Sequence, residues 1–319
     1  MLFITNRQLK QSARTRKNRK IDFDLAKNAP SNDLYYCRRS GKDDYVEVGS
    51  DALMQELRDN EYKQLLFFIH GFSNMPEPHI FPRVETLQSL LDNKEQGLVK
   101  VIPLIWPCDN DFGMIKDYWD DQKSADASAS SFTRLLNRFL DWRDEQSENN
   151  PCLKRINILA HSMGNRVFRQ TLLAWEKYDL PGGIPLLFRN TFLMAADVVN
   201  ETLARGEPGE LMSHSSRNIV VYFASDDLAL RSSKISNLRN KIASRRLGHT
   251  GPENIQKINS NIFSIDCDNF NNRYDTPKGH SYFLTDNSGN PGRVFEHMYH
   301  CIKAGRVDVD DTGTRTKVL

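Results

Sequence analysis

Cysteine is scarce in this sequence, and the few cysteines form no pattern. Five are scattered over 319 residues, without a Cys-x-x-Cys pair: Cys37, Cys108, Cys152, Cys267 and Cys301. An odd number at irregular spacing argues against a disulfide framework and against the common zinc motifs. We therefore expect a protein of a reducing compartment, cytoplasmic by default, with no metal site.

An excess of charge of one sign is also missing, as are long apolar runs. The 43 basic and 41 acidic residues leave a net charge of +2, which gives no general attraction to nucleic acid or to a membrane. No apolar run approaches the length of a membrane span. The apolar start of four residues is too short for the core of a signal peptide. We expect no membrane span and no nucleic-acid partner.

Two local basic stretches stand out against this balance, at residues 14–20 and 231–247. No aromatic residues interleave the first one, as stacking on bases would require. We interpret the first as a solvated loop and the second as the solvated face of a helix. A surface for nucleic acid or another acidic partner is the alternative for 14–20, and a phosphate-binding surface is the alternative for 231–247.

Strand-like and helical patterns alternate along most of the chain. Apolar runs at 64–71, 98–106, 156–160, 188–196, 218–224 and 261–266 are separated by helical periodicities such as 124–142. The alternation predicts an α/β fold, a doubly wound and mostly parallel sheet of about seven to eight strands with helices on both faces. Pro103 within one run indicates an edge strand or a bulge. The polar residues after 305 predict a frayed tail.

One short motif carries a chemical prediction. Ala160-His161-Ser162-Met163-Gly164 lies between an apolar run and a helical pattern. A strand, a sharp turn with serine at its tip, and a helix form the nucleophile elbow of α/β-hydrolases, usually written Gly-x-Ser-x-Gly. Ala160 replaces the first glycine and is still small. The alternative reading makes Ser162 a helix N-cap.

A nucleophilic serine needs a base, and in this fold the chain order is serine, acid, histidine. For the acid we favour Asp227, which follows a buried strand, with Asp226 and Asp197 as alternatives. For the base we favour His280, which lies in the loop after the last apolar run of the domain. The other histidines after the candidate acids are His249, His297 and His300.

The stretch Phe67-Phe68-Ile69-His70-Gly71-Phe72 ends an apolar run in His-Gly. In α/β-hydrolases the loop after such a strand supplies one backbone N–H of the oxyanion hole. We expect the N–H groups of Phe72 and Met163 to form that hole. His70, Trp106 and His161 are candidate pocket residues. The acidic and aromatic segment 107–123 fits either a lid over the site or a surface loop.

Several segments together resemble a largely bacterial, uncharacterised family of α/β-hydrolases. They begin with Phe68–Phe72 and Ile105–Pro107, include an elbow reading Ala-His-Ser-Met-Gly-Asn, and end with Ser225–Leu230 and Gly279-His280-Ser281-Tyr282-Phe283. The resemblance covers about residues 60–300. It implies a triad of Ser162, an aspartate near 227 and His280. Relatives often read Ala-Ala-Pro-Asp where this chain has Ala195-Ala196-Asp197, which weakens Asp197 as the acid.

We divide the chain into N-terminal strands with the basic loop (1–60, part of the sheet or appended to it), an α/β-hydrolase catalytic domain (61–303) and a polar tail (304–319).

The expected function is a serine hydrolase, esterase- or lipase-like, that cleaves an ester or acyl bond through an acyl-enzyme. Its substrate is a small or acylated molecule, and no cofactor is needed. Thioesterase, amidase and acyltransferase activities stay open. The alternative is a non-catalytic α/β-hydrolase fold that binds a ligand or partner. The sequence makes no prediction of oligomeric state.

Overall fold

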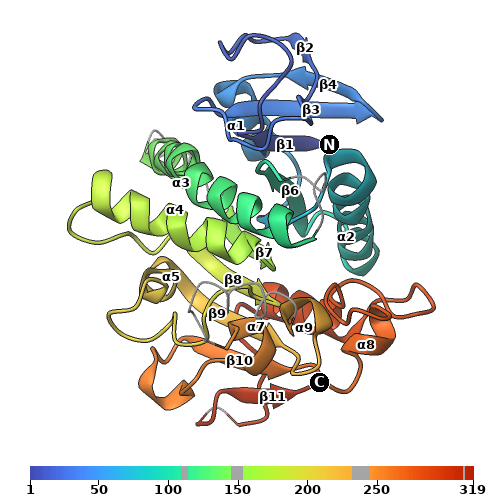
Figure 1. Ribbon diagram of the computed structural model, residues 1–319, viewed down its shortest axis with the longest axis vertical. Helices are drawn as coiled ribbons and strands as arrows, with labels where there is room; N and C mark the ends of the chain where they lie inside the picture. Colours follow the sequence, from blue (N-terminus) through green and yellow to red (C-terminus); the bar gives the residue numbers. More distant parts are fainter. Residues whose placement is uncertain (109–113, 145–153, 232–244, 312) are drawn as a thin grey trace.

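The computed structural model describes residues 1–108, 114–144, 154–231, 245–311 and 313–319. Within them, 11 strands form one sheet in the order β11-β10-β9-β8-β7-β5-β6-β1-β3-β4-β2 (Figure 1). Their bounds are β1 Leu2–Thr5, β2 Arg19–Ile21, β3 Tyr35–Gly41, β4 Asp44–Glu47, β5 Gln64–Ile69, β6 Val99–Ile105, β7 Arg155–His161, β8 Phe188–Met194, β9 Ser216–Phe223, β10 Ile262–Asp266 and β11 Thr316–Val318.

The sheet is mostly parallel. All neighbours from β11 to β1 pair in parallel, whereas β1-β3, β3-β4 and β4-β2 pair antiparallel. The predicted fold class is therefore confirmed, but the predicted seven to eight strands are too few. The strands at both ends of the sheet, β2 and β11, are three residues long and lie in segments predicted to be a polar loop and a frayed tail. Such short, half-exposed edge strands carry no apolar run to reveal them.

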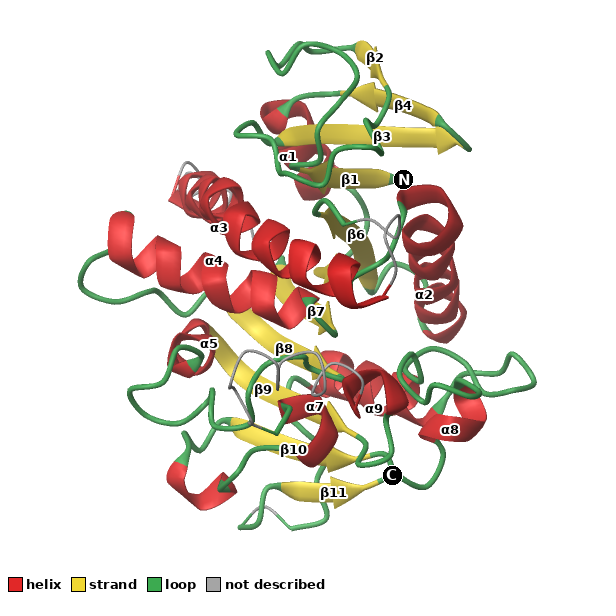
Figure 2. Ribbon diagram, viewed as in Figure 1, coloured by secondary structure: helices red, strands yellow, loops and turns green. Residues whose placement is uncertain are grey.

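Helices cover both faces, so the molecule has three layers (Figure 2). Apolar residues of α1 (Ser50–Asp59), α3 (Met114–Asp144) and α4 (Gly164–Tyr178) join one hydrophobic core, and those of α2 (Phe81–Lys94) and α9 (Arg293–Ala304) join the other. The residues of α4 that enter the core are spaced one helix face apart, as an amphipathic helix requires; they are Val167, Phe168, Leu172 and Trp175. Shorter helices are α5 (Glu210–Ser215), α7 (Leu247–Thr250) and α8 (Asn271–Tyr274), and η1 (Pro76–Ile80) and η2 (Ile255–Lys257) are single turns.

Two local predictions need correction. Pro103 is not in an edge strand, because β6 lies between β5 and β1. It directly precedes the two residue pairs that join β6 to β1, at Leu104 and Ile105, so its missing N–H falls outside that ladder. The long helix predicted to begin at 124 begins at Met114, so part of the acidic and aromatic segment is helical. The rest of that segment at 109–113, the polar stretch 147–151 that follows the predicted helix, and most of the basic stretch 231–247 lie outside the described residues.

The topology gathers several loops at one edge of the sheet. Strands β5, β7, β8 and β9 are parallel neighbours in that region, so their carboxyl ends share an edge. In open α/β sheets, ligands bind outside that edge. The loops that follow β5, β7, β8 and β9 carry the predicted site residues except Trp106, His280 and His161, which is the last residue of β7. Among the described residues, no helix is both long enough and apolar enough to span a membrane.

Candidate active site

Ser162 occupies the turn between β7 and α4. Its backbone φ is 53°, a left-handed conformation that costs a residue other than glycine about 1–3 kcal/mol. Neighbouring backbone groups hold it there: the Ser162 N–H donates to the Met194 carbonyl (2.9 Å), and the Ser162 carbonyl accepts from the Asp197 N–H (3.2 Å). The Asn165 side-chain amide donates to the same carbonyl (3.0 Å). The strained turn is thus fixed from β8 and from α4.

Two glycines allow the end of β5 to lie directly against this turn. A Cβ added at Gly164 would stand 2.4 Å from the Ile69 carbonyl oxygen and 2.6 Å from that of His70. A Cβ added at Gly71 would stand 2.8 Å from the Ser162 Cβ. Only glycine permits such approaches without displacing backbone. The loop after β5 and the serine turn therefore form one closely packed unit.

A Gly164→Ala substitution is expected to lower the free energy of unfolding by about 2–3 kcal/mol, in the upper range for an overpacked site. The methyl group would overlap two backbone carbonyls that cannot move without shifting β5. Urea unfolding followed by circular dichroism measures the change. Gly182→Ala is the matched control, because nothing lies within 4 Å of its added Cβ. If the two variants are equally stable, the close packing of β5 on α4 is wrong.

His280 and Asp227 meet at the same edge of the sheet. The distance from His280 Nδ1 to Asp227 Oδ2 is 2.7 Å, and Asp227 is fully buried. The other carboxylate oxygen, Oδ1, accepts the Leu230 N–H (3.0 Å), which fixes the carboxylate against the chain that follows β9. This arrangement holds the imidazole with Nδ1 toward the acid and leaves Nε2 for another partner.

The pKa of His280 is raised above its ordinary value of 6.5. Burial lowers this pKa, but the charge and hydrogen bond of Asp227, with smaller contributions from Asp197 and Asp275, outweigh burial and favour the protonated ring. A histidine tuned this way is a stronger base than an isolated one.

His161 connects the histidine to the serine turn. Its ring lies 4.8 Å from the His280 ring, centroid to centroid, and its Nε2 is 3.3 Å from the His280 carbonyl oxygen. Burial, followed by the charges of His280 and Arg83, lowers the pKa of His161 well below the ordinary range, so its ring is neutral. Within the described residues, no hydrogen bond joins Ser162 Oγ to His280.

The two alternative acids have other partners. Asp226 accepts from the side-chain amides of Asn271 (2.6 Å) and Asn272. Asp197 pairs with Arg246 Nε (3.1 Å) and accepts from the Tyr118 hydroxyl (2.8 Å). Its backbone thus touches the serine turn while its carboxylate faces a cation.

The three other candidate bases lie apart from Asp227. His297 bonds to the Tyr222 hydroxyl (2.8 Å) and the Asp308 carbonyl (2.7 Å). His300 is exposed on α9, and His249 is half-buried in α7. His280, in contrast, hydrogen-bonds to the candidate acid Asp227.

In the loop that carries the predicted oxyanion donor Phe72, hydrogen bonds hold the backbone carbonyl groups on either side of its N–H. The Gly71 carbonyl accepts from His70 Nδ1 (2.8 Å) and from the Asn74 amide (3.0 Å). The Asn74 amide also donates to the Phe72 carbonyl (2.7 Å). A trans peptide points its N–H opposite to its carbonyl, so the Phe72 N–H faces away from these partners. Among the described residues, the N–H groups of Phe72 and Met163 donate to no protein acceptor.

His70 and Trp106 support this loop from behind. Both side chains are fully buried, and their rings stack at 5.1 Å with 3° between the planes. The Trp106 N–H donates to His70 Nε2 (3.2 Å) and its indole N–H to the His70 carbonyl (2.9 Å). Burial lowers the pKa of His70 to about 3, so its Nδ1–H remains a fixed donor to the loop. Neither ring faces solvent.

Three further residues shape the loops without any signal in the sequence that marks them for this role. Asn74 ties the loop after β5, and Asp275 accepts the backbone N–H groups of His280 (2.8 Å) and Ser281 (2.7 Å). Arg83 lies between both loops, with Asn74 Oδ1 at 3.3 Å and Ser281 Oγ at 3.4 Å. No local pattern marks them, because each contact joins a loop to a residue brought near by folding or by a turn.

No site for a metal emerges from the part of the chain that the structure describes. Groups of three or more His, Cys, Asp or Glu side chains placed to hold an ion do not occur there. The site is instead a serine at a strained turn, a histidine–aspartate pair and two unpaired backbone N–H groups. Such a set can carry out acyl transfer.

The match to a family model agrees with the fold. Residues 48–289 match the family model described as "Alpha/beta hydrolase of unknown function (DUF900)". Among solved structures, phospholipase PlaB from Legionella pneumophila, in complex with thio-NAD, is similar at 15% identity and a TM-score of 0.30. The match covers 67% of this chain and 39% of that one, so the chain spans about two fifths of that protein's length. No curated protein matches significantly.

Proposed function

The chain belongs to a family of α/β-hydrolases of unknown function, and from this membership we propose that it is a serine hydrolase that cleaves an ester bond through an acyl-enzyme. The observation that carries the proposal is the 2.7 Å contact between His280 and buried Asp227, beside a serine whose φ is 53°. In the proposal, Ser162 is the nucleophile, His280 the base and Asp227 the residue that orients it.

The steps follow the ordinary chemistry of acyl transfer. His280 Nε2 takes the Ser162 hydroxyl proton as Oγ attacks the carbonyl carbon, and the carbonyl oxygen becomes an oxyanion. That oxyanion accepts from the Phe72 and Met163 N–H groups, each donor contributing about 2.7–4 kcal/mol. His280 then gives its proton to the leaving alcohol. Water, activated by the same histidine, releases the acid and restores Ser162.

Proton transfer requires Ser162 Oγ to come within hydrogen-bond reach of His280 Nε2. Such contacts commonly tighten only when substrate is bound. The substrate we propose is a small or acylated molecule whose carbonyl reaches the edge of the sheet at β5 and β7. The proposal uses no metal or cofactor.

A fluorophosphonate probe tests the nucleophile directly. The probe forms a covalent bond to an activated serine, and mass spectrometry of the digested protein identifies the residue. We expect the label on the peptide that contains Ser162, and no label after denaturation. A native protein that takes no label, while a known serine hydrolase in the same tube does, would favour the non-catalytic alternative.

The rate is also expected to depend on pH through His280. The base must be neutral, and burial, which lowers its pKa, is outweighed by Asp227, so the pKa lies above 6.5. Activity should therefore fall as the pH drops through a midpoint above 6.5. The profile of kcat/KM for a p-nitrophenyl ester reports this group in the free enzyme. A midpoint below 6.5 contradicts the assignment, and His161 and His70, whose pKa values are lowered, would then be considered.

A further inference from the structure

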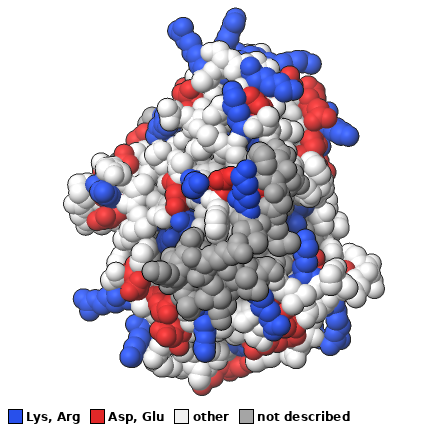
Figure 3. Space-filling model, in the orientation of Figure 1, with Lys and Arg blue, Asp and Glu red and all other residues white. Residues whose placement is uncertain are grey.

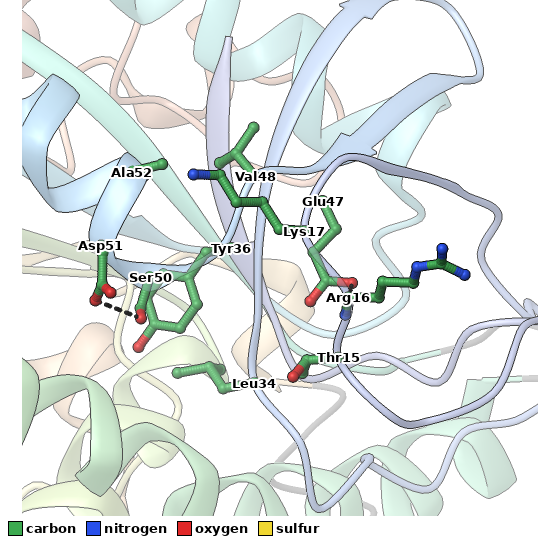
Figure 4. A pocket seen from close by; sticks show the side chains of 11 residues that line it. Thr15, Arg16, Lys17, Leu34, Tyr36, Glu47, Val48, Ser50, Asp51 and Ala52 are labelled. Carbon is green, nitrogen blue, oxygen red and sulfur yellow. Dashed lines mark hydrogen bonds between the residues drawn. The ribbon is translucent and has the colours of Figure 1, made fainter.

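We propose that a second site, separate from Ser162, binds a small molecule through its phosphate group. It is a pocket of about 310 Å³ formed by the loop at 15–17, the beginning of β3, the end of β4 and the beginning of α1 (Figure 4). Four strand spacings, about 19 Å, separate β3 from β7 in the sheet. The pocket therefore takes no part in the proposed hydrolysis.

The carboxylates in this pocket are already neutralised. Glu47 pairs with Arg19 Nε (2.6 Å) and accepts the backbone N–H of Arg16 (3.2 Å). Asp51 pairs with Arg138. The side chains of Lys17 and Arg16, in contrast, form no ion pair within the described residues. The pocket thus has an excess of positive charge.

Basic side chains are numerous on the surrounding surface, among some acidic ones (Figure 3). Figure 3 shows Lys and Arg side chains gathered over the end of the molecule where β2, β3 and β4 lie. Figure 4 shows the Lys17 side chain extending toward the α1 side of the pocket, whereas Arg16 points away from it. We therefore expect Lys17 to contact the ligand and Arg16 to act through its field.

Tyr36, a mostly buried residue, supplies a hydroxyl donor without a protein partner among the described residues. Its side chain is 8% exposed, and its hydroxyl makes no hydrogen bond within the part of the chain that the structure describes. Figure 4 shows its ring extending toward Ser50 and Asp51. Burial raises the pKa of Tyr36 to about 12, so the hydroxyl keeps its proton and can donate.

The beginning of α1 adds backbone donors. Its N-cap is Gly49, which has no side chain to cap the helix, so no side-chain hydrogen bond is made there. The first N–H groups of a helix lack partners within the helix and favour an anion. In α1 these belong to Ser50, Asp51 and Ala52, which all line the pocket.

These donors suit a phosphate group, and the pocket suits a small molecule better than a polymer such as nucleic acid. A phosphate offers several acceptor oxygens and bonds readily to backbone N–H groups, a hydroxyl and an ammonium together. Leu34, Val48 and Ala52 provide an apolar wall for a short carbon skeleton. A volume of about 310 Å³ is at the small end of ligand pockets. A phosphate monoester of a few carbons fits these features.

Isothermal titration of the whole protein with glycerol 3-phosphate, inorganic phosphate and glycerol tests the site. We expect saturable binding of glycerol 3-phosphate and none of glycerol. Lys17→Gln should weaken binding about tenfold and Tyr36→Phe about fivefold. Lys20→Gln is the control, since it lies in the same basic segment, faces Asp44 (3.6 Å) and does not line the pocket.

Further measurements distinguish the possible ligands of this pocket and show whether the proposal holds. Sedimentation with vesicles containing phosphatidic acid distinguishes a lipid headgroup from a free phosphate ester, and either ligand supports the phosphate site. The proposal is overturned if no phosphate compound binds, or if Lys20→Gln weakens binding as much as Lys17→Gln does. Binding should be unchanged in Ser162→Ala, whatever that variant does to hydrolysis.

Discussion

A Ser162→Ala variant is expected to lower kcat for hydrolysis of a p-nitrophenyl ester by on the order of 10⁴- to 10⁶-fold. The hydroxyl is the group that bonds to the substrate carbon in the proposed chemistry, so its loss removes the covalent route. The backbone donors at Phe72 and Met163 would remain and would account for residual activity above the uncatalysed rate. Alanine keeps the turn as it is, so the free energy of unfolding should change by less than about 0.5 kcal/mol.

Ser225→Ala provides the matched control. Ser225 follows β9 at the same edge of the sheet, and its hydroxyl donates to Asp268 Oδ2 (2.7 Å) rather than facing the serine turn. Its activity should stay within a few fold of wild type. If Ser162→Ala hydrolyses the ester and takes up the fluorophosphonate as fast as Ser225→Ala does, Ser162 is not the nucleophile.

Much of the fold could be predicted from local patterns. The central strands are buried on both faces and therefore read as unbroken apolar runs, as at 65–69 and 219–223. The edges could not be predicted this way. β2 is made of Arg19, Lys20 and Ile21, and its place in the sheet depends on pairing with β4. That pairing is a tertiary event that a three-residue segment does not encode by itself.

In the candidate site, too, some features follow from local sequence and others depend on tertiary contacts. The serine turn is local, since a strand, small residues and a helix within ten positions specify it. The acid is not local: Asp226 and Asp227 are adjacent, and the direction of each carboxylate depends on which distant loop lies against it. In the structure, Asn271 bonds to Asp226, while His280 bonds to Asp227. Asp197 stays open in the sequence because its position at the end of a strand resembles that of a catalytic acid. In the structure its carboxylate contacts Arg246 and Tyr118.

These contacts lead to a comparison of three isosteric substitutions. Asp227→Asn is expected to lower kcat about 10⁴-fold, because an amide facing His280 Nδ1 favours the wrong tautomer and no longer stabilises the protonated ring. Asp226→Asn should lower kcat less than tenfold, since the partners of Asp226 are the neutral amides of Asn271 and Asn272. The measurement is kcat per mole of folded protein.

Asp197→Asn separates a structural role from a catalytic one. It removes the partner of Arg246, whose side chain is 7% exposed, and breaking a buried ion pair costs about 3–5 kcal/mol of stability. Its folded fraction should nevertheless retain most of its activity, because the 2.7 Å contact between His280 and Asp227 is untouched. Asp227→Asn should show the opposite pattern, with a large loss of kcat. If folded Asp197→Asn loses 10⁴-fold in kcat while Asp227→Asn does not, the acid lies in the loop after β8 and the pairing of Asp227 with His280 is structural.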